Sequence, residues 1–357
     1  MASMATEKMT KKNNLIILCF SFTFLTILVV GDRGGDGLTY HGRKQVGKLF
    51  VFGDSYADTG NMGKFIERPW SEPYGITFPG KPTGRFSDGR VFTDFVASYL
   101  NIRSPVPYKV RHTGKELLGY GMNFAVGGSG VFDTIDLQPN LTIQIDRFEN
   151  QLKEGVFSEH DLRSSIAIVV ISGNDYSTFQ ANGGTMDGLL QFIPRLVDQI
   201  KTDMKRVRKL GVRNIGITDL HPLGCTPDLT IIDSYRACND SVNDMVDLHN
   251  AVLSAAVREL NEGFTDSKFL MLGVNQAFMS VINSKGEGKF KEVLKPCCAA
   301  LDQQFSCSNT DFHGKKLYSL CSDRRSSFYW DSVHPTQAGW AAVAPQIRDV
   351  VLHLAKF

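Results

Sequence analysis

The sequence has almost no excess of charge of either sign. Its 357 residues include 39 lysines and arginines and 37 aspartates and glutamates, which gives a formal net charge of +2. Proteins that bind nucleic acids or anionic membranes usually carry a basic surplus, so the composition gives no support for either partner. With 42% hydrophobic and 21% charged residues, the chain has the composition of a folded protein with a large core.

The sequence also lacks the spacings that typically bind zinc. It contains no C-x-x-C pair and no H-x-x-x-H pair, and these pairs supply the ligands of many zinc sites. His249, on a predicted helix, and His313, in a cysteine-rich loop, are not interpreted as metal ligands. We therefore expect no metal ion. His221, which precedes a proline, is interpreted as a loop histidine.

No apolar stretch reaches the length of a comfortable membrane span. The run LIILCFSFTFLTILVV, residues 15–30, has 16 residues and follows three lysines, whereas a span needs ~20 apolar residues. A basic start followed by a short apolar run is typical of a secretory signal peptide. We expect residues 1–31 to be that signal and to be removed, with an uncleaved signal anchor as the alternative. Residues 32–47 are expected to form a flexible lead-in, and residues 48–357 a single domain.

Cysteine usage agrees with export. Cys19 lies in the predicted signal, and the six remaining cysteines are an even number, which suggests three disulfides in an exported chain. Six cysteines allow 15 pairings. We expect one bridge to join Cys225 to Cys238 and the other four cysteines to close the segment 297–321. The six candidates are Cys225, Cys238, Cys297, Cys298, Cys307 and Cys321.

Five short apolar runs lack strict polar alternation, as strands covered on both faces do. These runs are residues 48–52, 122–126, 166–171, 214–219 and 268–272. Helical patterns lie between or after them, at residues 91–100, 186–211, 244–263 and 336–357. The alternation predicts an α/β fold, a three-layer α/β/α sandwich with a central, mostly parallel five-stranded sheet. In such sheets, functional groups lie just beyond the carboxyl ends of the strands.

Polar clusters follow three of these strands or precede the last helix. The first strand runs directly into Asp54 and Ser55, so the serine is presented at its end. Asp54 is interpreted as a turn residue that caps the following segment. The other clusters are NFAVGGSG at 123–130, SGNDY at 172–176 and WDSVHP at 330–335.

These four blocks, in this order, resemble the plant GDSL esterase/lipase family of the SGNH hydrolase superfamily. The stretches YGITFPGKPTGRFSDGR, 74–90, and LHPLGCTP, 220–227, resemble the same branch, and the likeness covers nearly the whole chain after residue 47. One position departs from the pattern: Tyr56 stands where the family's name has leucine. That residue follows the nucleophile and has no chemical step of its own. The resemblance implies a flavodoxin-like fold.

The blocks supply the parts of a serine hydrolase. A serine hydroxyl becomes a good nucleophile when a base takes its proton. Ser55 is the expected nucleophile and His334 the expected base. Asp331, three positions earlier, is expected to hold the correct imidazole tautomer. The sequence has no G-x-S-x-G elbow, so the scaffold differs from that of the α/β-hydrolases.

An oxyanion needs hydrogen-bond donors where its charge develops. The expected donors are the Ser55 N–H, the Gly128 N–H and the Asn174 side-chain amide, which complete the family's set. Gly127 is the neighbouring alternative, and spacing from Asn123 favours Gly128. The alternative interpretation treats GGSG as a plain turn and Asn174 as a helix cap.

The sequence therefore predicts a secreted serine esterase or lipase that hydrolyses carboxylic esters through an acyl-enzyme and needs no cofactor. One alternative is an acyltransferase of specialised metabolism with the same residues, and another is a catalytically silent binding or modifier protein. The expected partner is a small-molecule or lipid ester, and the expected state is a monomer. We expect an extracellular location or another secretory compartment such as the vacuole. Asn140 and Asn239 lie in N-x-S/T sequons and are expected to be glycosylated there.

Overall fold

The computed structural model describes residues 46–64, 68–113, 115–302 and 304–356. The predicted signal peptide and residues 32–45 of the predicted lead-in lie outside these residues. The last two lead-in residues belong to the fold: Val46 is buried, and the Gly47 N–H donates to the Ser164 carbonyl at 2.7 Å. Within the described part of the chain, no helix combines the length and the hydrophobicity that a membrane crossing requires.

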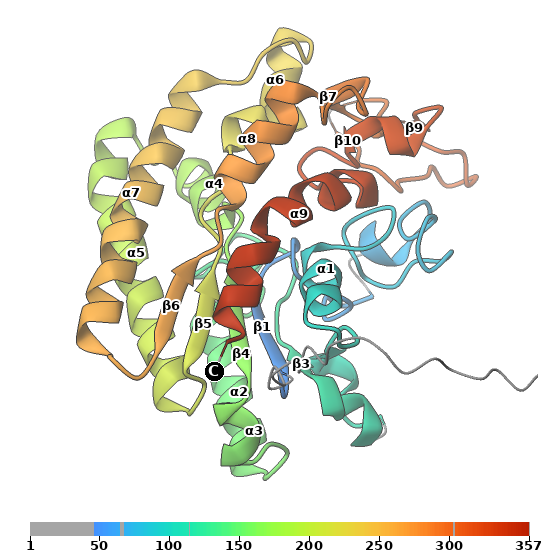
Figure 1. Cartoon of the computed structure of the whole chain (residues 1–357). Coiled ribbons are helices and arrows are strands. Elements are labelled where there is room, and N and C mark those ends of the chain that lie inside the picture. The colour runs from blue at the N-terminus through green and yellow to red at the C-terminus, as the bar shows by residue number, and fades with distance from the viewer. Residues whose placement is uncertain (1–45, 65–67, 114, 303, 357) are drawn as a thin grey trace, which may run out of the picture. The chain divides into compact units, whose positions relative to one another are not determined.

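A parallel sheet of six strands lies at the centre of the fold (Figure 1). The strands are β1 (Leu49–Gly53), β2 (Val106–Pro107), β3 (Gly121–Asn123), β4 (Ile166–Val170), β5 (Asn214–Ile217) and β6 (Lys268–Met271). All five predicted strands are present. The expected number of five is corrected to six by β2, an edge strand of two residues. Its proline lacks an N–H and its length gives no periodicity, so the sequence carries no strand signal there.

The order of strands across the sheet is β2-β3-β1-β4-β5-β6. Without the short edge strand, this is the 2-1-3-4-5 order of flavodoxin-like folds, in which the connections change direction between the first and third strands. Here those strands are β1 and β4, which pair in parallel from Leu49 opposite Ile166 to Gly53 opposite Val170. A ligand crevice is therefore expected beyond the carboxyl ends of β1 and β4.

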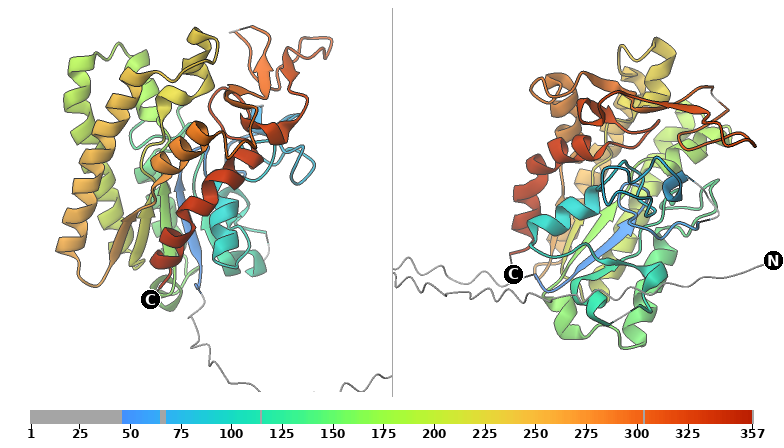
Figure 2. Two further views of the ribbon diagram at one scale, coloured as in Figure 1. Left: turned by 45° about the horizontal axis from the view of Figure 1, so that its top comes forward. Right: turned by 90° about the vertical axis from the view of Figure 1, so that its right-hand side faces the viewer.

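Helices cover both faces of the sheet (Figures 1 and 2). Side chains of α2, α5 and α7 pack with Phe50 and Phe52 on one face, and those of α1, α8 and α9 pack with Leu49 and Val51 on the other. Successive residues of β1 thus serve opposite cores, as the two-residue period of a strand requires. The helices are α1 (Phe92–Tyr99), α2 (Leu141–Lys153), α3 (Glu159–Arg163), α4 (Asn174–Ala181), α5 (Met186–Lys209), α6 (Pro227–Thr230), α7 (Asp240–Gly263), α8 (Val274–Ser284) and α9 (Gln337–Leu354).

Two small sheets and two of the three disulfides support the segment that precedes α9. The strands are β7 (Glu292–Pro296), paired with β10 (Ser327–Tyr329), and β8 (Cys298–Ala300), paired with β9 (Tyr318–Leu320). The disulfides are Cys225–Cys238, Cys297–Cys321 and Cys298–Cys307, which agree with the expected loops. The Cys298 N–H donates to the Trp330 carbonyl at 2.6 Å. The cysteine-rich segment therefore holds the backbone next to Asp331.

Candidate active site

Ser55, His334 and Asp331 form one continuous hydrogen-bonded chain. The Ser55 Oγ lies 2.8 Å from His334 Nε2, although 279 residues separate the two in the sequence. The His334 Nδ1 lies 2.8 Å from each carboxylate oxygen of Asp331. All three side chains are buried. A base in contact with the hydroxyl, itself oriented by a carboxylate, is the arrangement that activates a serine for attack on a carbonyl.

The Asp331 carboxylate is held by further donors. Its Oδ1 accepts the Val333 and His334 N–H groups at 3.0 and 2.8 Å, and its Oδ2 accepts the Tyr74 hydroxyl at 2.6 Å. Burial by itself would raise the pKa of Asp331, but the charge of His334 and these hydrogen bonds lower it to about 2. The carboxylate is therefore ionised at any pH above ~3, as an orienting group must be.

The turn after β1 presents Ser55 through a glycine and a buried carboxyl group. Gly53 has φ +131°, and a Cβ there would lie 2.0 Å from the Val170 carbonyl oxygen, so only glycine fits. Asp54 accepts the Tyr56 N–H at 3.1 Å and the Ser172 N–H at 2.6 Å. It thereby joins the end of β1 to the end of β4, which extends the turn role expected for it.

One of the expected oxyanion donors, Asn174, contacts the block that holds another, Gly128. The Asn174 side-chain amide donates one hydrogen to the Ser129 carbonyl at 2.8 Å, which connects the start of α4 to the GGSG block and leaves its second hydrogen for a ligand. The Gly127 N–H is already bonded to Asp58 at 2.9 Å. Among the described residues, the N–H groups of Ser55 and Gly128 have no acceptor. This distribution favours Gly128 over Gly127 as the second backbone donor.

Comparison with known proteins identifies the family. Residues 49–347 match the family model described as GDSL-like Lipase/Acylhydrolase. Two GDSL esterase/lipases of Arabidopsis thaliana are each 44% identical to the chain, one over 94% of both proteins and the other over 92% of this chain and 95% of that protein.

The chain belongs to the GDSL-like lipase/acylhydrolase family. It is accordingly a carboxylic ester hydrolase. Among solved structures, an acetylxylan esterase from Geobacillus stearothermophilus is similar with a TM-score of 0.39 and 15% identity, over 88% of this chain and 97% of that one. That likeness is too small to bear on the substrate of this family member.

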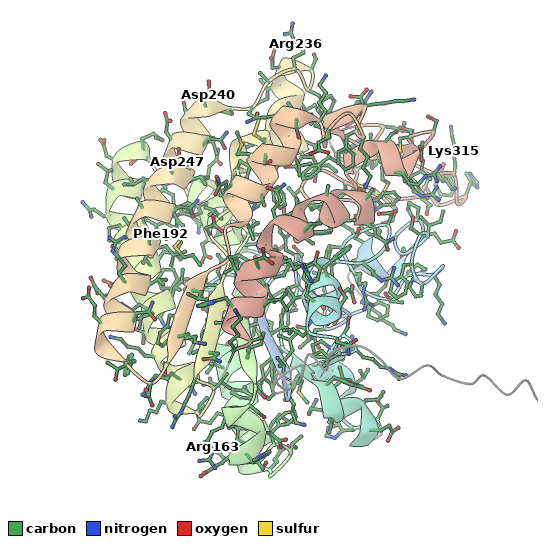
Figure 3. All side chains as sticks on the ribbon, viewed as in Figure 1. Arg163, Phe192, Arg236, Asp240, Asp247 and Lys315 are labelled. Carbon is green, nitrogen blue, oxygen red and sulfur yellow. A yellow bond between two sulfur atoms is a disulfide. The ribbon has the colours of Figure 1, made fainter. Side chains whose placement is uncertain are left out.

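A cavity of about 540 Å³ opens beside Ser55 and Asn174. It is enclosed mainly by α4, the start of α5, the segment 221–232 and the start of α7. Phe179, one of its wall residues, stacks on Phe192 of α5 with ring centroids 4.7 Å apart (Figure 3 labels Phe192). The wall includes the apolar side chains of Phe179, Leu189, Leu223, Leu229, Val242 and Met245. Among the described residues that line it there is no lysine or arginine, and Asp228 is its one carboxyl group.

Sequence reasoning missed several residues around this site. Tyr74 reaches Asp331 across 257 positions, and only its place in a family-like stretch could have drawn attention to it. His221 lies in a loop, as expected, but it also lines the cavity and is in hydrogen-bond contact with Tyr56. His249 is buried, and its Nδ1 lies 2.7 Å from the Tyr176 hydroxyl. None of these pairs has a local signature, because their partners are distant in the sequence.

Both sequon asparagines are helix N-caps. The Asn140 Oδ1 accepts the Ile143 N–H at 3.0 Å, and the Asn239 Oδ1 accepts the Val242 N–H at 3.2 Å. Asn239 also lines the cavity beside Ser55. The capping bond uses the amide oxygen, so the Asn239 nitrogen is available for a glycan without loss of the cap.

Asp54 is expected to make stability depend on pH. Burial raises its pKa from 3.8 to about 6, although hydrogen bonds from Ser172 and Tyr56 oppose the rise. Between these values the folded protein binds this proton more tightly than the unfolded chain does. The contribution of Asp54 to the free energy of unfolding is therefore full below pH ~3.8 and is lost as the pH rises through 6.

The Asp54→Asn variant removes this titration. The difference in free energy of unfolding, parent minus variant, should fall by up to about 3 kcal/mol between pH 4 and pH 7. Denaturant unfolding of both proteins at pH 4, 5, 6 and 7 measures it. The hydrogen bond that the amide cannot replace adds a constant offset, so a difference that does not change with pH would contradict the raised pKa.

Proposed function

We propose that the chain hydrolyses carboxylic esters with an apolar acyl group, through an acyl-enzyme on Ser55. The observation that carries this proposal is the hydrogen-bonded chain from Ser55 to His334 and Asp331, with Ser55 opening on a mainly apolar cavity. Family membership supports the reaction class.

In the first half-reaction, the Ser55 Oγ forms a bond to the ester carbonyl carbon as His334 Nε2 takes its proton. The same nitrogen then gives that proton to the departing alkoxide, which leaves as an alcohol. In the second half, a water molecule attacks the acyl carbon and loses a proton to His334 Nε2. The bond between that carbon and the Ser55 Oγ then breaks, His334 returns the proton to the Oγ, and the acid leaves. Asp331 stays ionised throughout and stabilises the imidazolium that forms twice.

Each tetrahedral intermediate carries a negative oxygen. The Ser55 and Gly128 N–H groups and the second amide hydrogen of Asn174 are the donors we assign to it. The acyl chain occupies the cavity between α4, α5 and α7. Its wall favours an uncharged chain, because a charged group there would lose its hydration without a lysine or arginine to pair with.

A fluorophosphonate probe on the purified protein tests the proposal. It should label Ser55, and a panel of activated esters of increasing acyl length should be hydrolysed with KM falling as the chain fills the cavity. Labelling without release of acid, but with transfer to an added alcohol, would favour an acyltransferase. Absence of labelling would favour a catalytically silent protein.

The Asn174→Ala variant should lose about 10²–10³-fold in kcat, because one oxyanion donor is removed. Thermal unfolding should change little, since the substitution removes only one hydrogen bond within the protein, that from the amide to the Ser129 carbonyl. Asn182→Ala, just beyond the last residue of the same helix, is the matched control and should keep its kcat. Full activity of Asn174→Ala on the activated ester would assign this residue to a structural role alone.

We also propose that the chain enters the secretory pathway, on the basis of its first 31 residues, its three disulfides and its two sequons. Sequencing of the N-terminus of exported protein tests the removal of the signal. A mobility shift with an endoglycosidase, compared between Asn140→Gln and Asn239→Gln, tests each glycan. Exported material that begins at Met1 would overturn the cleavage.

A further inference from the structure

Tyr56, the residue at which this chain departs from the leucine of the family's name, makes two hydrogen bonds that a leucine cannot make. Its hydroxyl lies 2.7 Å from the Val333 carbonyl oxygen and 2.9 Å from His221 Nε2. Val333 is the residue immediately before His334, and Tyr56 immediately follows Ser55. The phenol thus joins the two loops that carry the hydroxyl and the imidazole of the active site.

The direction of these two bonds follows from the atoms involved. A carbonyl oxygen only accepts, so the single Tyr56 proton points at Val333. The Tyr56 oxygen must then accept from His221, which places the proton of His221 on Nε2. Burial, with a smaller effect from the charge of His334, lowers the pKa of His221 to about 3, so His221 is neutral at ordinary pH. A neutral imidazole carries the one N–H that this arrangement needs.

Packing holds both rings in place independently of the hydrogen bonds. The Tyr56 ring meets Trp340 edge-on with centroids 5.2 Å apart, and the His221 ring lies 5.3 Å from that of Phe278. Tyr56 and His221 are 3% and 2% exposed. Because the rings are fixed by their neighbours, removal of the hydroxyl alone should leave the ring where it is and free the Val333 carbonyl.

We propose that Tyr56 and His221 are positioning residues, which form a chain from His221 Nε2–H through the Tyr56 hydroxyl to the Val333 carbonyl and set the distance between Ser55 and His334. This inference rests on the proposed function. The nucleophile and the base sit on separate loops, 279 positions apart, so contacts between the loops fix the distance between them. The contacts between Asp331 and His334 orient the imidazole within its own loop, whereas Tyr56 ties that loop to the nucleophile turn.

The Tyr56→Phe variant tests the chain. The ring and its packing remain, so the variant should fold, but kcat should fall about 10-fold or more because a loosened base costs proton-transfer efficiency. KM should stay within about twofold, since the hydroxyl is committed to Val333 and not to substrate. The rate of labelling by the fluorophosphonate probe should fall in parallel with kcat. If the hydroxyl had only a structural role, its removal would lower the melting temperature and leave kcat and labelling unchanged.

Tyr329→Phe is the matched control. Tyr329 belongs to the same buried cluster as Tyr56, and its hydroxyl has no hydrogen-bond partner among the described residues. The same chemical change there should leave kcat and labelling unaltered. An equal loss in both variants would assign the effect to core packing and overturn the inference.

A double-mutant cycle with His221→Phe tells whether the two hydrogen bonds of Tyr56 act together as one chain or as two independent contacts. His221→Phe should reduce kcat less than Tyr56→Phe does, because the tyrosine can still donate to Val333. In the Tyr56→Phe background, His221→Phe should cause no further loss of kcat, because the bond from the Tyr56 hydroxyl to Val333, which His221 supports, is already gone. Additive losses would overturn the chain. If the parent protein is not labelled at all, the proposed function fails instead, so the two failures are distinguishable.

Discussion

The Ser55→Ala variant is expected to lose all labelling by the fluorophosphonate probe and about 10⁶-fold in kcat. Every covalent step of the proposed mechanism passes through its Oγ, which lies 2.8 Å from His334 Nε2. The hydroxyl is expected to add little to stability. Thermal unfolding should therefore stay close to that of the parent. The comparison is made on one activated ester, with active-site titration of the parent protein to fix the enzyme concentration.

The His334→Ala variant provides the matched comparison. Because serine and histidine act as a unit, its loss should be about as large as that of Ser55→Ala, and the double variant should lose no more. Residual hydrolysis above the uncatalysed rate should survive in all three, since the oxyanion donors remain. Equal rates of Ser55→Ala and the parent would make Ser55 a turn residue and would favour the binding-protein alternative.

The location of the site was predictable because functional groups of a parallel sheet lie just beyond the carboxyl ends of its strands. The five apolar runs gave the strands, and the carboxyl ends of parallel strands share one edge. Ser55 after β1 and Asn174 after β4 follow from that rule alone, and the structure has β1 beside β4. The family resemblance then indicated that the last block, with Asp331 and His334, joins them.

The contacts that fix the geometry could not be read from the sequence. Asp58 accepts N–H groups of Gly60, Asn61, Met62 and Gly127, and so joins the nucleophile turn to the GGSG block. Tyr74 meets Asp331, and Tyr56 meets His221, across more than a hundred positions each. Periodicity reports which face of an element is apolar, but it carries no information on which polar side chains meet after the chain has folded. The edge strand β2 was missed for a simpler reason, its length of two residues.

The Asp331→Asn variant is expected to fold and to lose up to about 10⁴-fold in kcat, because it imposes the wrong imidazole tautomer. The neighbouring donors fix the orientation of the side-chain amide in this variant. The Oδ1 position accepts two backbone N–H groups, from Val333 and His334, so the amide oxygen must occupy it. The amide NH₂ then takes the Oδ2 position, 2.8 Å from His334 Nδ1. A hydrogen donated to Nδ1 drives the imidazole proton to Nε2. That nitrogen faces Ser55 and, once protonated, can no longer accept the serine's proton.

Tyr74→Phe is the graded comparison for this last prediction. It removes the hydroxyl that donates to Oδ2 but keeps the carboxylate charge and the imidazole tautomer. Its kcat should fall about 10-fold at most, far less than that of Asp331→Asn, with KM unchanged in both because neither side chain is expected to touch the acyl group. Steady-state rates, the probe labelling rate and thermal unfolding of the three proteins measure the ranking. Similar small losses in both variants would mean that the charge of Asp331 is dispensable and that backbone contacts alone orient His334.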